Sequence, residues 1–293
     1  MPKFRTAVFG LSLAMAFAGP PAKAETSADK VSYVTFPTLH PTKPLTVAAR
    51  FTKPAIQGKL PAVVVLHGSG GVSGREEAYQ LALARAGIAS IAIDEWSARG
   101  LGGDAGGRPA TVLETLPDVY GARAWLAARS DIDAERIGVL GFSFGGVAAM
   151  LAATERIQGE YSPDGRGFAA AMPVYPVCWI YGQVEGYDFK DLTGVPVRIV
   201  TGAADEYDDN GDACPALARM LPEVERRTVS VMVIEGAHHG FDKPGEDRTV
   251  SDPFSHRGRG GAATLRYDAD AMARSTAEAA RFFGEALKAG GRP

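Results

Sequence analysis

The sequence predicts an α/β fold: a mostly parallel, eight-stranded sheet with helices on both faces. Short, continuous apolar runs such as residues 62–66 are typical of strands that are buried on both sides. Segments with helical spacing of apolar residues alternate with these runs, which indicates βαβ crossovers and a parallel sheet. Because one core of this kind can include everything after residue 24, we expect a single domain over residues 25–293.

The expected strands fall into two groups. Residues 31–36 and 45–51 are separated by prolines and fit an antiparallel start to the sheet. Six apolar segments then follow as strands: 62–66, 88–93, 136–140, 169–175, 195–201 and 229–234. Helices are expected over residues 76–86, with Gly87 as a C-cap, and over 115–130, 147–154 and 270–287. Residues 99–108 and 242–263 are glycine-rich or polar and are predicted as long loops.

The first 24 residues have the pattern of a secretory signal peptide. A basic start is followed by a mostly apolar stretch over residues 6–19 and by the small-residue cleavage signal Ala22-Lys-Ala24. The apolar stretch is shorter than the roughly 20 residues that a membrane-spanning helix needs. An N-terminal buried helix is the alternative. We therefore expect a secreted or periplasmic protein that is cleaved near Ala24 and has no membrane span.

The charge of the chain bears on its binding partners, and its two cysteines bear on a disulfide. The signal segment contains three basic residues and no acidic ones, so removing three positive charges from the net charge of −3 gives −6. No basic stripe suggests a nucleic-acid partner. In an exported protein, Cys178 and Cys214 favour one disulfide, which would stabilise the fold by roughly 4 kcal/mol in the chain-entropy model. Two separate buried thiols are the alternative.

Reactive side chains follow the predicted strands of the parallel sheet. They are His67, Asp94, Glu95, Arg99, Ser143, Asp205, His238 and His239. Ligand sites in open parallel sheets lie beyond the carboxyl ends of the strands. We therefore expect these residues to meet at one edge of the sheet.

The segment Gly141-Phe-Ser-Phe-Gly145 fits the G-x-S-x-G pattern between a strand and a helix. The glycines allow a sharp turn that exposes Ser143 as a nucleophile, and the N-terminus of the following helix favours developing negative charge. The alternative is that Ser143 is only a small residue that a tight turn requires. The sequence predicts that Ser143 is the nucleophile.

A serine nucleophile needs a base and a group that orients the base, in the chain order serine, acid, histidine. Asp205 directly follows a predicted strand, and we favour it over its rivals Glu206, Asp208, Asp209 and Asp212. We favour His239 over His238 as the base because His239 adjoins Gly240-Phe241. His238 is then a packing residue or a secondary contact.

Two backbone N–H groups are candidates for the oxyanion hole. One is that of Phe144, directly after the nucleophile, and the other is that of Ser69 in the 67–71 loop. His67 is expected to shape this loop. A zinc site of His67, His238 and His239 lacks the usual ligand spacing, and the acidic residues after Asp205 lack the pattern of a calcium loop. We expect no metal and no cofactor.

Taken together, these motifs resemble the α/β-hydrolases, and within them the dienelactone-hydrolase-like family. The resemblance rests on segments 61–71, 93–100, 136–146, 202–205 and 236–241. It implies the eight-stranded hydrolase sheet and the triad Ser143, Asp205 and His239. It also implies that Arg99, in the D-x-x-x-A-R stretch, binds a substrate carboxylate, with Trp96 of the same stretch as a second substrate-binding residue. A salt-bridged, loop-ordering arginine is the alternative for Arg99.

Exported relatives carry a cysteine after a Tyr-Pro pair and another beyond the acid, a pattern that Cys178 and Cys214 fit. This strengthens the expectation of a disulfide between them. The chain departs from dienelactone hydrolases proper in two places. They use a cysteine nucleophile where this chain has Ser143, and a glutamate where it has Gly68. The thiol-switching mechanism of those enzymes is therefore not expected.

The predicted function is hydrolysis of small carboxylic esters or lactones through an acyl-enzyme. A serine peptidase or acyltransferase on the same scaffold is the enzymatic alternative. A non-catalytic binding protein is the alternative from another class. The sequence does not predict the oligomeric state.

Overall fold

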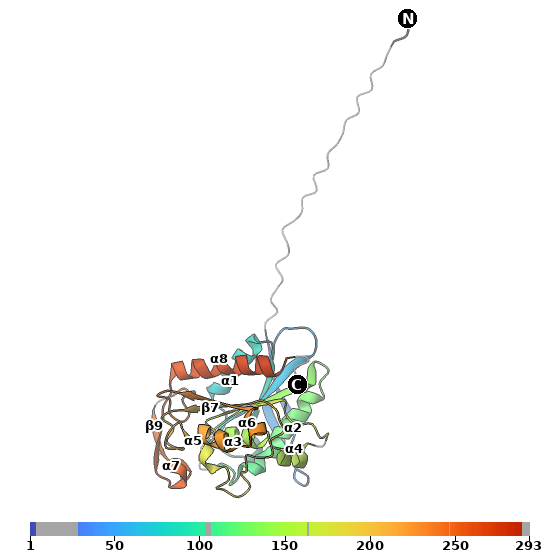
Figure 1. Ribbon diagram of the computed structural model, residues 1–293. Coiled ribbons are helices and arrows are strands. Elements are labelled where there is room, and N and C mark those ends of the chain that lie inside the picture. Colours follow the sequence, from blue (N-terminus) through green and yellow to red (C-terminus); the bar gives the residue numbers. More distant parts are fainter. Residues whose placement is uncertain (4–28, 103–106, 163, 246, 289–293) are drawn as a thin grey trace.

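The centre of the protein is one eight-stranded sheet (Figure 1). The computed structural model describes residues 1–3, 29–102, 107–162, 164–245 and 247–288. The predicted signal peptide therefore lies almost wholly outside the described residues. Within the described part of the chain, no helix is long and apolar enough to cross a membrane.

The strands follow the order β1-β2-β4-β3-β5-β6-β7-β8 across the sheet. The antiparallel start is β1 (Lys30–Pro37) and β2 (Thr46–Lys53), and β2 pairs antiparallel with β4. The other neighbours pair in parallel, and their bounds are β3 (Leu60–Leu66), β4 (Ala89–Asp94), β5 (Ile132–Phe142), β6 (Ala170–Val174), β7 (Val197–Gly202) and β8 (Val229–Ile234). The predicted mostly parallel sheet is confirmed.

Helices cover both faces of the sheet, as the sequence predicts (Figure 1). One face is covered by α1 (Gly74–Arg85) and α8 (Ala269–Ala286). The other is covered by α2 (Leu116–Ala127), α3 (Phe144–Leu151), α4 (Glu155–Tyr161) and α5 (Ala213–Met220), and the short α6 (Glu223–Arg226) contacts the edge strand β8.

The apolar sequence of β3 is explained by burial of the strand on both faces of the sheet. Val63 and Val65 pack into the core layer of α1 and α8, whereas Val64 and Leu66 pack into the layer of α2 and α3. All four side chains are fully buried. Complete burial of such a side chain contributes about 1.5–3 kcal/mol. The end of β3, which leads into the 67–71 loop, is therefore held firmly from both sides.

The prediction of a long loop over residues 242–263 is only partly right. This region contains β9 (Arg248–Ser251) and α7 (Ser255–Gly258), and β9 pairs antiparallel with β10 (Ala262–Leu265) in a second, two-stranded sheet. The two strands have four residues each, too few for a clear alternation of apolar and polar residues. Short 3-10 turns η1 (Ser97–Arg99), η3 (Val112–Thr115) and η4 (Cys178–Ile180) were also not predicted.

The predicted disulfide is present. Cys178 of η4 and Cys214 of α5 are joined, with their Cα atoms 5.0 Å apart and a sequence separation of 36. The bond ties η4, which follows β6, to α5, which follows β7. It therefore anchors two connections that leave the sheet at the edge where the parallel strands end.

We expect loss of this disulfide to lower the free energy of unfolding by about 4 kcal/mol, because the open chain regains the entropy that the closed loop had removed. Urea unfolding of the Cys178→Ser/Cys214→Ser double variant measures the loss. Wild-type protein unfolded in the presence of a reductant serves as the control and should show a similar decrease. Equal stability of the oxidised protein and the double variant would contradict the expectation.

Candidate active site

The reactive residues named from the sequence do lie at the carboxyl ends of successive parallel strands. His67 follows β3, Glu95 follows β4, Ser143 follows β5, Asp205 lies shortly after β7, and His239 shortly after β8. The strand order places β3, β5, β6, β7 and β8 side by side. Segments far apart in the sequence thus meet at one edge of the sheet.

Ser143 occupies a sharp turn between β5 and α3. Its backbone angles are φ 50° and ψ −111°, which a residue with a side chain rarely adopts. The flanking glycines make the turn possible: a Cβ on Gly141 would lie 2.0 Å from the Gly145 carbonyl oxygen, and one on Gly145 would lie 2.5 Å from the His67 carbonyl oxygen. The turn therefore requires glycine at both positions, and it presents the Ser143 hydroxyl to the site.

Ser143, His239 and Asp205 form a continuous chain of hydrogen bonds. The Ser143 hydroxyl and His239 Nε2 are 2.8 Å apart, and His239 Nδ1 and Asp205 Oδ2 are also 2.8 Å apart. Because a carboxylate only accepts hydrogen bonds, Nδ1 carries the proton and Nε2 accepts from the hydroxyl. Asp205 is fully buried, and its second oxygen accepts the backbone N–H of Tyr207 at 2.9 Å.

The imidazole of His239 contacts two aromatic rings that sequence reasoning missed. The ring of Tyr207 lies 4.1 Å from it, centroid to centroid, and the ring of Tyr175 lies 4.8 Å from it. Contacts with two rings restrict rotation of the imidazole and help to keep Nε2 directed at Ser143. Tyr175 belongs to the Tyr-Pro pair of the family pattern, but nothing in the sequence assigns either tyrosine a contact with His239, because that contact depends on the path of two loops.

Three of the four rivals of the favoured acid have other partners, whereas Asp212 and the rival base His238 have no side-chain partner among the described residues. Asp208 accepts the backbone N–H groups of Cys178 and Trp179, at 2.9 and 2.8 Å, and Asp209 pairs with His256 and Arg259. Glu206 accepts the backbone N–H of Thr264. Asp212 stands at the start of α5. His238 Nδ1 is buried without a hydrogen-bond partner among the described residues.

The two expected oxyanion donors border the site. The backbone N–H groups of Ser69 and Phe144 have no hydrogen-bond partner among the described residues, and both residues line a cavity beside Ser143. The 67–71 loop is closed by a bond from the Gly71 N–H to the Gly68 carbonyl at 3.0 Å. The site can therefore offer two N–H groups to a negatively charged oxygen next to Ser143.

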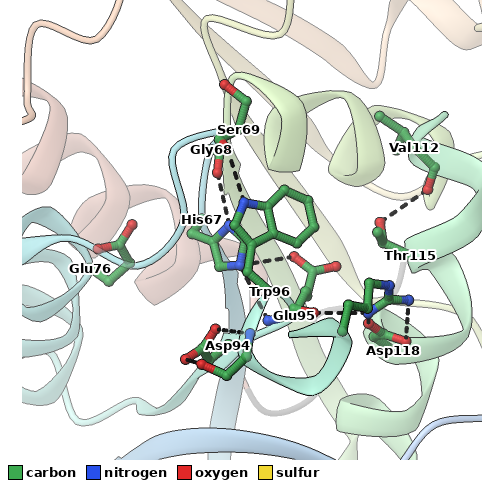
Figure 2. A network of polar contacts seen from close by, with 12 residues as sticks. His67, Gly68, Ser69, Glu76, Asp94, Glu95, Trp96, Val112, Thr115 and Asp118 are labelled. Atoms are coloured by element: carbon green, nitrogen blue, oxygen red, sulfur yellow. Dashed lines mark hydrogen bonds and ion pairs between the residues drawn. The ribbon is translucent and has the colours of Figure 1, made fainter. Parts of the chain in front are cut away.

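Trp96 and His67 fix the 67–71 loop from behind (Figure 2). Trp96 Nε1 donates to the Ser69 carbonyl at 2.9 Å, and His67 Nδ1 donates to the Gly68 carbonyl at 2.8 Å. The two rings also meet edge to face, with centroids 4.6 Å apart. Trp96 is 2 % exposed and lines neither cavity beside Ser143. Its observed contacts are thus with the loop, and its expected substrate role stays a prediction.

His67 is neutral in this environment. Its Nε2 accepts the backbone N–H of Glu95 at 3.2 Å, so Nδ1 carries the single proton. Burial lowers the pKa of His67 to about 4. A neutral His67 keeps both hydrogen bonds, one to each of two loops, over the physiological pH range.

Arg99 forms an ion pair with the buried Asp118 and is itself partly buried. Its Nη1 donates to Asp118 of α2 at 2.5 Å and to the Glu95 carbonyl at 3.0 Å, and its Nη2 donates to the Glu114 carbonyl. Burial, and next the neighbouring Asp118, raises the pKa of Glu95. Arg99 lines neither cavity beside Ser143. Its contacts favour the alternative of a loop-ordering arginine, and its carboxylate-binding role stays a prediction.

Two cavities adjoin Ser143. The larger has a volume of about 890 Å³, and its wall includes His239, Tyr175 and several basic side chains. The smaller, of about 70 Å³, is bordered by Phe144 and by five aliphatic side chains, those of Ala110, Val112, Val147, Val177 and Ile180. Arg108 and Asp252 border both cavities. A substrate at Ser143 therefore meets a polar, roomy side and a narrow, apolar side.

The region that contains β9 and β10 forms one wall of the larger cavity. Leu265 of β10 pairs with His239 through an isolated bridge, and Tyr207 donates to Asp252 at 3.2 Å. Arg108 also contacts Asp252, at 3.3 Å. The predicted loop is thus part of the site and is fixed next to the histidine.

Among the described residues, one group of three potential metal ligands lies close enough to share an ion: Cys178, Asp208 and Cys214. Because the disulfide uses both sulfur atoms, this group lacks the thiolates that a metal ion would bind.

The sheet order, the strand-turn-helix around Ser143 and the histidine after the last strand define the protein as an α/β-hydrolase. The chain matches the family model described as "Dienelactone hydrolase family" over residues 47–287 and belongs to that family. Membership of this family indicates a hydrolase of ester-type substrates. No curated protein sequence matches the chain.

Several solved structures share the fold. A dienelactone hydrolase-like promiscuous phosphotriesterase from metagenomic libraries is 19% identical, with 88% of this chain and 99% of that chain covered and a TM-score of 0.61. A hyperthermophilic esterase from Pyrobaculum calidifontis is 18% identical, with coverages of 89% and 84% and a TM-score of 0.59. Thermogutta terrifontis esterase 2 is 17% identical, with coverages of 90% and 96% and a TM-score of 0.58.

We expect Trp96→Phe to lower kcat for ester hydrolysis by up to about tenfold with little change in KM. The substitution removes one hydrogen bond that holds the Ser69 backbone, and such a bond contributes about 1 kcal/mol. Trp125→Phe is the matched control, because Trp125 packs on Phe51 away from the 67–71 loop. Equal kcat values for the two variants would contradict this role of Trp96.

We also expect His67 to destabilise the folded protein as the pH falls from 7 to 4. Its pKa is lowered from 6.5 to about 4 on folding, so only the unfolded chain gains this proton between those values. The free energy of unfolding is therefore lower by about 3 kcal/mol at pH 4. Urea unfolding at pH 7 and pH 4 measures the free energy of unfolding. Its decrease between the two pH values should be smaller in His67→Asn than in the wild type by about this amount.

Asp208 acts in the opposite direction, because burial and then Asp205 raise its pKa to about 7, which favours the folded state as the pH falls. Asp208 is present in both proteins, so its contribution cancels in the comparison. The same pH dependence in wild type and His67→Asn would contradict the expectation for His67.

Proposed function

We propose that the protein is a serine hydrolase that cleaves small carboxylic esters or lactones through an acyl-enzyme. The observation that carries the proposal is the unbroken chain from the Ser143 hydroxyl through His239 to the buried Asp205, with both contacts at 2.8 Å. In such a chain the histidine takes the serine proton, and the buried carboxylate orients the imidazole and stabilises its charged form.

The proposed reaction has two halves. The Ser143 oxygen attacks the carbonyl carbon while His239 Nε2 takes the hydroxyl proton. The N–H groups of Ser69 and Phe144 donate to the resulting oxyanion, and loss of one such donor typically costs about 3 kcal/mol of transition-state stabilisation. His239 then gives the proton to the leaving oxygen. Water, activated by the same histidine, releases the acid and restores Ser143.

The two cavities support small substrates. The apolar cavity of about 70 Å³ has room for only a few carbon atoms, so a long or bulky group fits only on the other side of Ser143. A serine peptidase or acyltransferase remains the enzymatic alternative, and a binding protein of the same fold the non-catalytic one. A substrate panel of esters, lactones and short peptides separates them.

We further propose that the protein is exported and cleaved near Ala24. The disulfide between Cys178 and Cys214 supports an oxidising compartment. The intact mass of the exported protein tests both points, because it reports the cleavage position and the presence of the disulfide in one measurement. A full-length mass with two free thiols would contradict the proposal.

Ser143→Ala should lower kcat/KM for a p-nitrophenyl acyl ester by at least about 1,000-fold, because the acyl-enzyme cannot form. Wild-type protein should be labelled covalently by a fluorophosphonate probe, and the variant should not. Ser69→Ala is the matched control: it also removes a hydroxyl at the site but keeps the backbone donor, so labelling should persist. Equal hydrolysis by wild type and Ser143→Ala would refute the serine mechanism.

A further inference from the structure

The smaller cavity beside Ser143 lies on the acyl side of the proposed reaction. His239 lines the larger cavity and does not line the smaller one. Because the leaving oxygen takes its proton from His239 Nε2, the alcohol part of a substrate lies in the larger cavity. The two residues with the proposed oxyanion donors, Ser69 and Phe144, both border the smaller cavity. The acyl chain, on the other side of the carbonyl carbon, therefore enters the smaller cavity.

Val177 forms part of the wall of this cavity in a backbone conformation that is unfavourable for valine. Its φ and ψ are 54° and 70°, in the left-handed region. A β-branched residue is a clear outlier there, and such a conformation persists only where the surrounding structure imposes it. The side chain is 6 % exposed and borders the cavity. The protein thus keeps a strained valine at a position where glycine would be relaxed.

Two contacts next to Val177 hold this conformation in place. Cys178, the following residue, is joined by the disulfide to Cys214 of α5. The buried carboxylate of Asp208 accepts the backbone N–H groups of Cys178 and Trp179, at 2.9 and 2.8 Å. The chain after Val177 is therefore fixed, through a covalent bond and two hydrogen bonds, to the residues that follow β7.

The same segment, residues 177–180, determines more of the cavity wall. Ile180 is buried and also borders the cavity. Trp179 Nε1 donates to the carbonyl oxygen of Phe254 at 3.1 Å, and Phe254 is a further residue of the wall. A Cβ on Gly258 would lie only 2.6 Å from the ring of Trp179, so α7 packs directly against this segment. The width of the cavity therefore depends on the fixed position of residues 177–180.

We propose that Val177 is a specificity-determining residue that limits the length of the acyl chain, and that the disulfide holds it in place. Resting on the proposed hydrolase function, this makes the preferred substrate an ester of a short-chain carboxylic acid. The methyl groups of Val177 occupy the space that a longer chain needs in a cavity of about 70 Å³. When the disulfide is absent, Val177 returns to a favourable backbone conformation, its side chain leaves this position, and longer chains fit.

The test compares p-nitrophenyl hexanoate with p-nitrophenyl acetate, which have the same leaving group. The acyl ratio is kcat/KM for the hexanoate divided by kcat/KM for the acetate, and we expect it to be below one in the wild type. Val177→Ala removes two methyl groups from the wall and should raise the acyl ratio at least about tenfold, the effect of one methylene group in a hydrophobic pocket. Val177→Gly should raise it as well.

Two control variants separate the position of Val177 from its chemistry. Val250→Ala is the same substitution at a residue that lines the larger cavity but not the smaller one. Asp191→Gly removes another left-handed residue, with φ 52°, that lines neither of these cavities. Both should keep the acyl ratio of the wild type. An equal rise in Val177→Ala and Val250→Ala would overturn the assignment of the acyl chain to the smaller cavity.

The part of the disulfide is tested with Cys178→Ser/Cys214→Ser, at a temperature where circular dichroism shows that the variant is folded. The acyl ratio should rise towards that of Val177→Ala, while the acetate is still hydrolysed. In a Val177→Gly background the same two substitutions should change the ratio little, because glycine has no side chain to move. A wild-type acyl ratio in the protein without the disulfide would overturn its role in holding Val177.

A binding measurement separates this proposal from the proposed function. Calorimetric titration of Ser143→Ala with the two intact esters should show that adding Val177→Ala raises the affinity for the hexanoate relative to the acetate, whether or not the protein is an enzyme. This change in affinity without any hydrolysis by the wild type would contradict the proposed function and support the cavity assignment. Unchanged relative affinity and an unchanged acyl ratio would overturn the role of Val177, while Ser143-dependent hydrolysis of the acetate would stand.

Discussion

The close packing of the turn at Ser143 against the end of β3 is the constraint on which the site depends. The turn fits because Gly145 lies directly against the carbonyl oxygens of Leu66 and His67, where a Cβ would be 2.7 and 2.5 Å away. This contact determines the backbone conformation of Ser143, the start of α3 and the position of the 67–71 loop. The proposed nucleophile and both proposed oxyanion donors thus share one rigid junction, and the burial of β3 from both sides of the sheet stabilises it.

Two buried polar networks support this junction from opposite sides of the sheet. Behind the 67–71 loop, neutral His67, Trp96 and the Arg99–Asp118 pair connect the loop to β4 and α2. On the face of α1 and α8, Arg75, Tyr175, Asp242 and Tyr79 link α1 to the segments after β6 and β8. Unpaired polar groups are costly to bury, so such networks hold a specific geometry in place. Each network orders a backbone segment that borders Ser143.

Much of this arrangement could be predicted from the sequence, because it follows from local patterns. Unbroken apolar runs predict the parallel strands, and G-x-S-x-G followed in chain order by Asp205 and His239, each after a strand, predicts the site. What could not be predicted depends on the path of the chain between strands. The four-residue strands β9 and β10 are too short for periodicity to identify, yet they carry part of the cavity wall. Tyr175, Tyr207 and Arg75 belong to the site only because of how distant segments pack.

The contrast between Arg99 and Arg75 shows why a motif alone does not assign a charge to a substrate. Arg99 lies in the stretch that the family resemblance marks, but its hydrogen bonds go to Asp118 and to two backbone carbonyls. Arg75 belongs to no motif, and its Nη2 faces the space that Gly68 leaves next to Ser143. Since a guanidinium binds an anion through donors that are not already used, the partners of each nitrogen matter more than the position of the residue in a motif. By that criterion the contacts of Arg99 favour a loop-ordering role, and its binding of a substrate carboxylate stays a prediction.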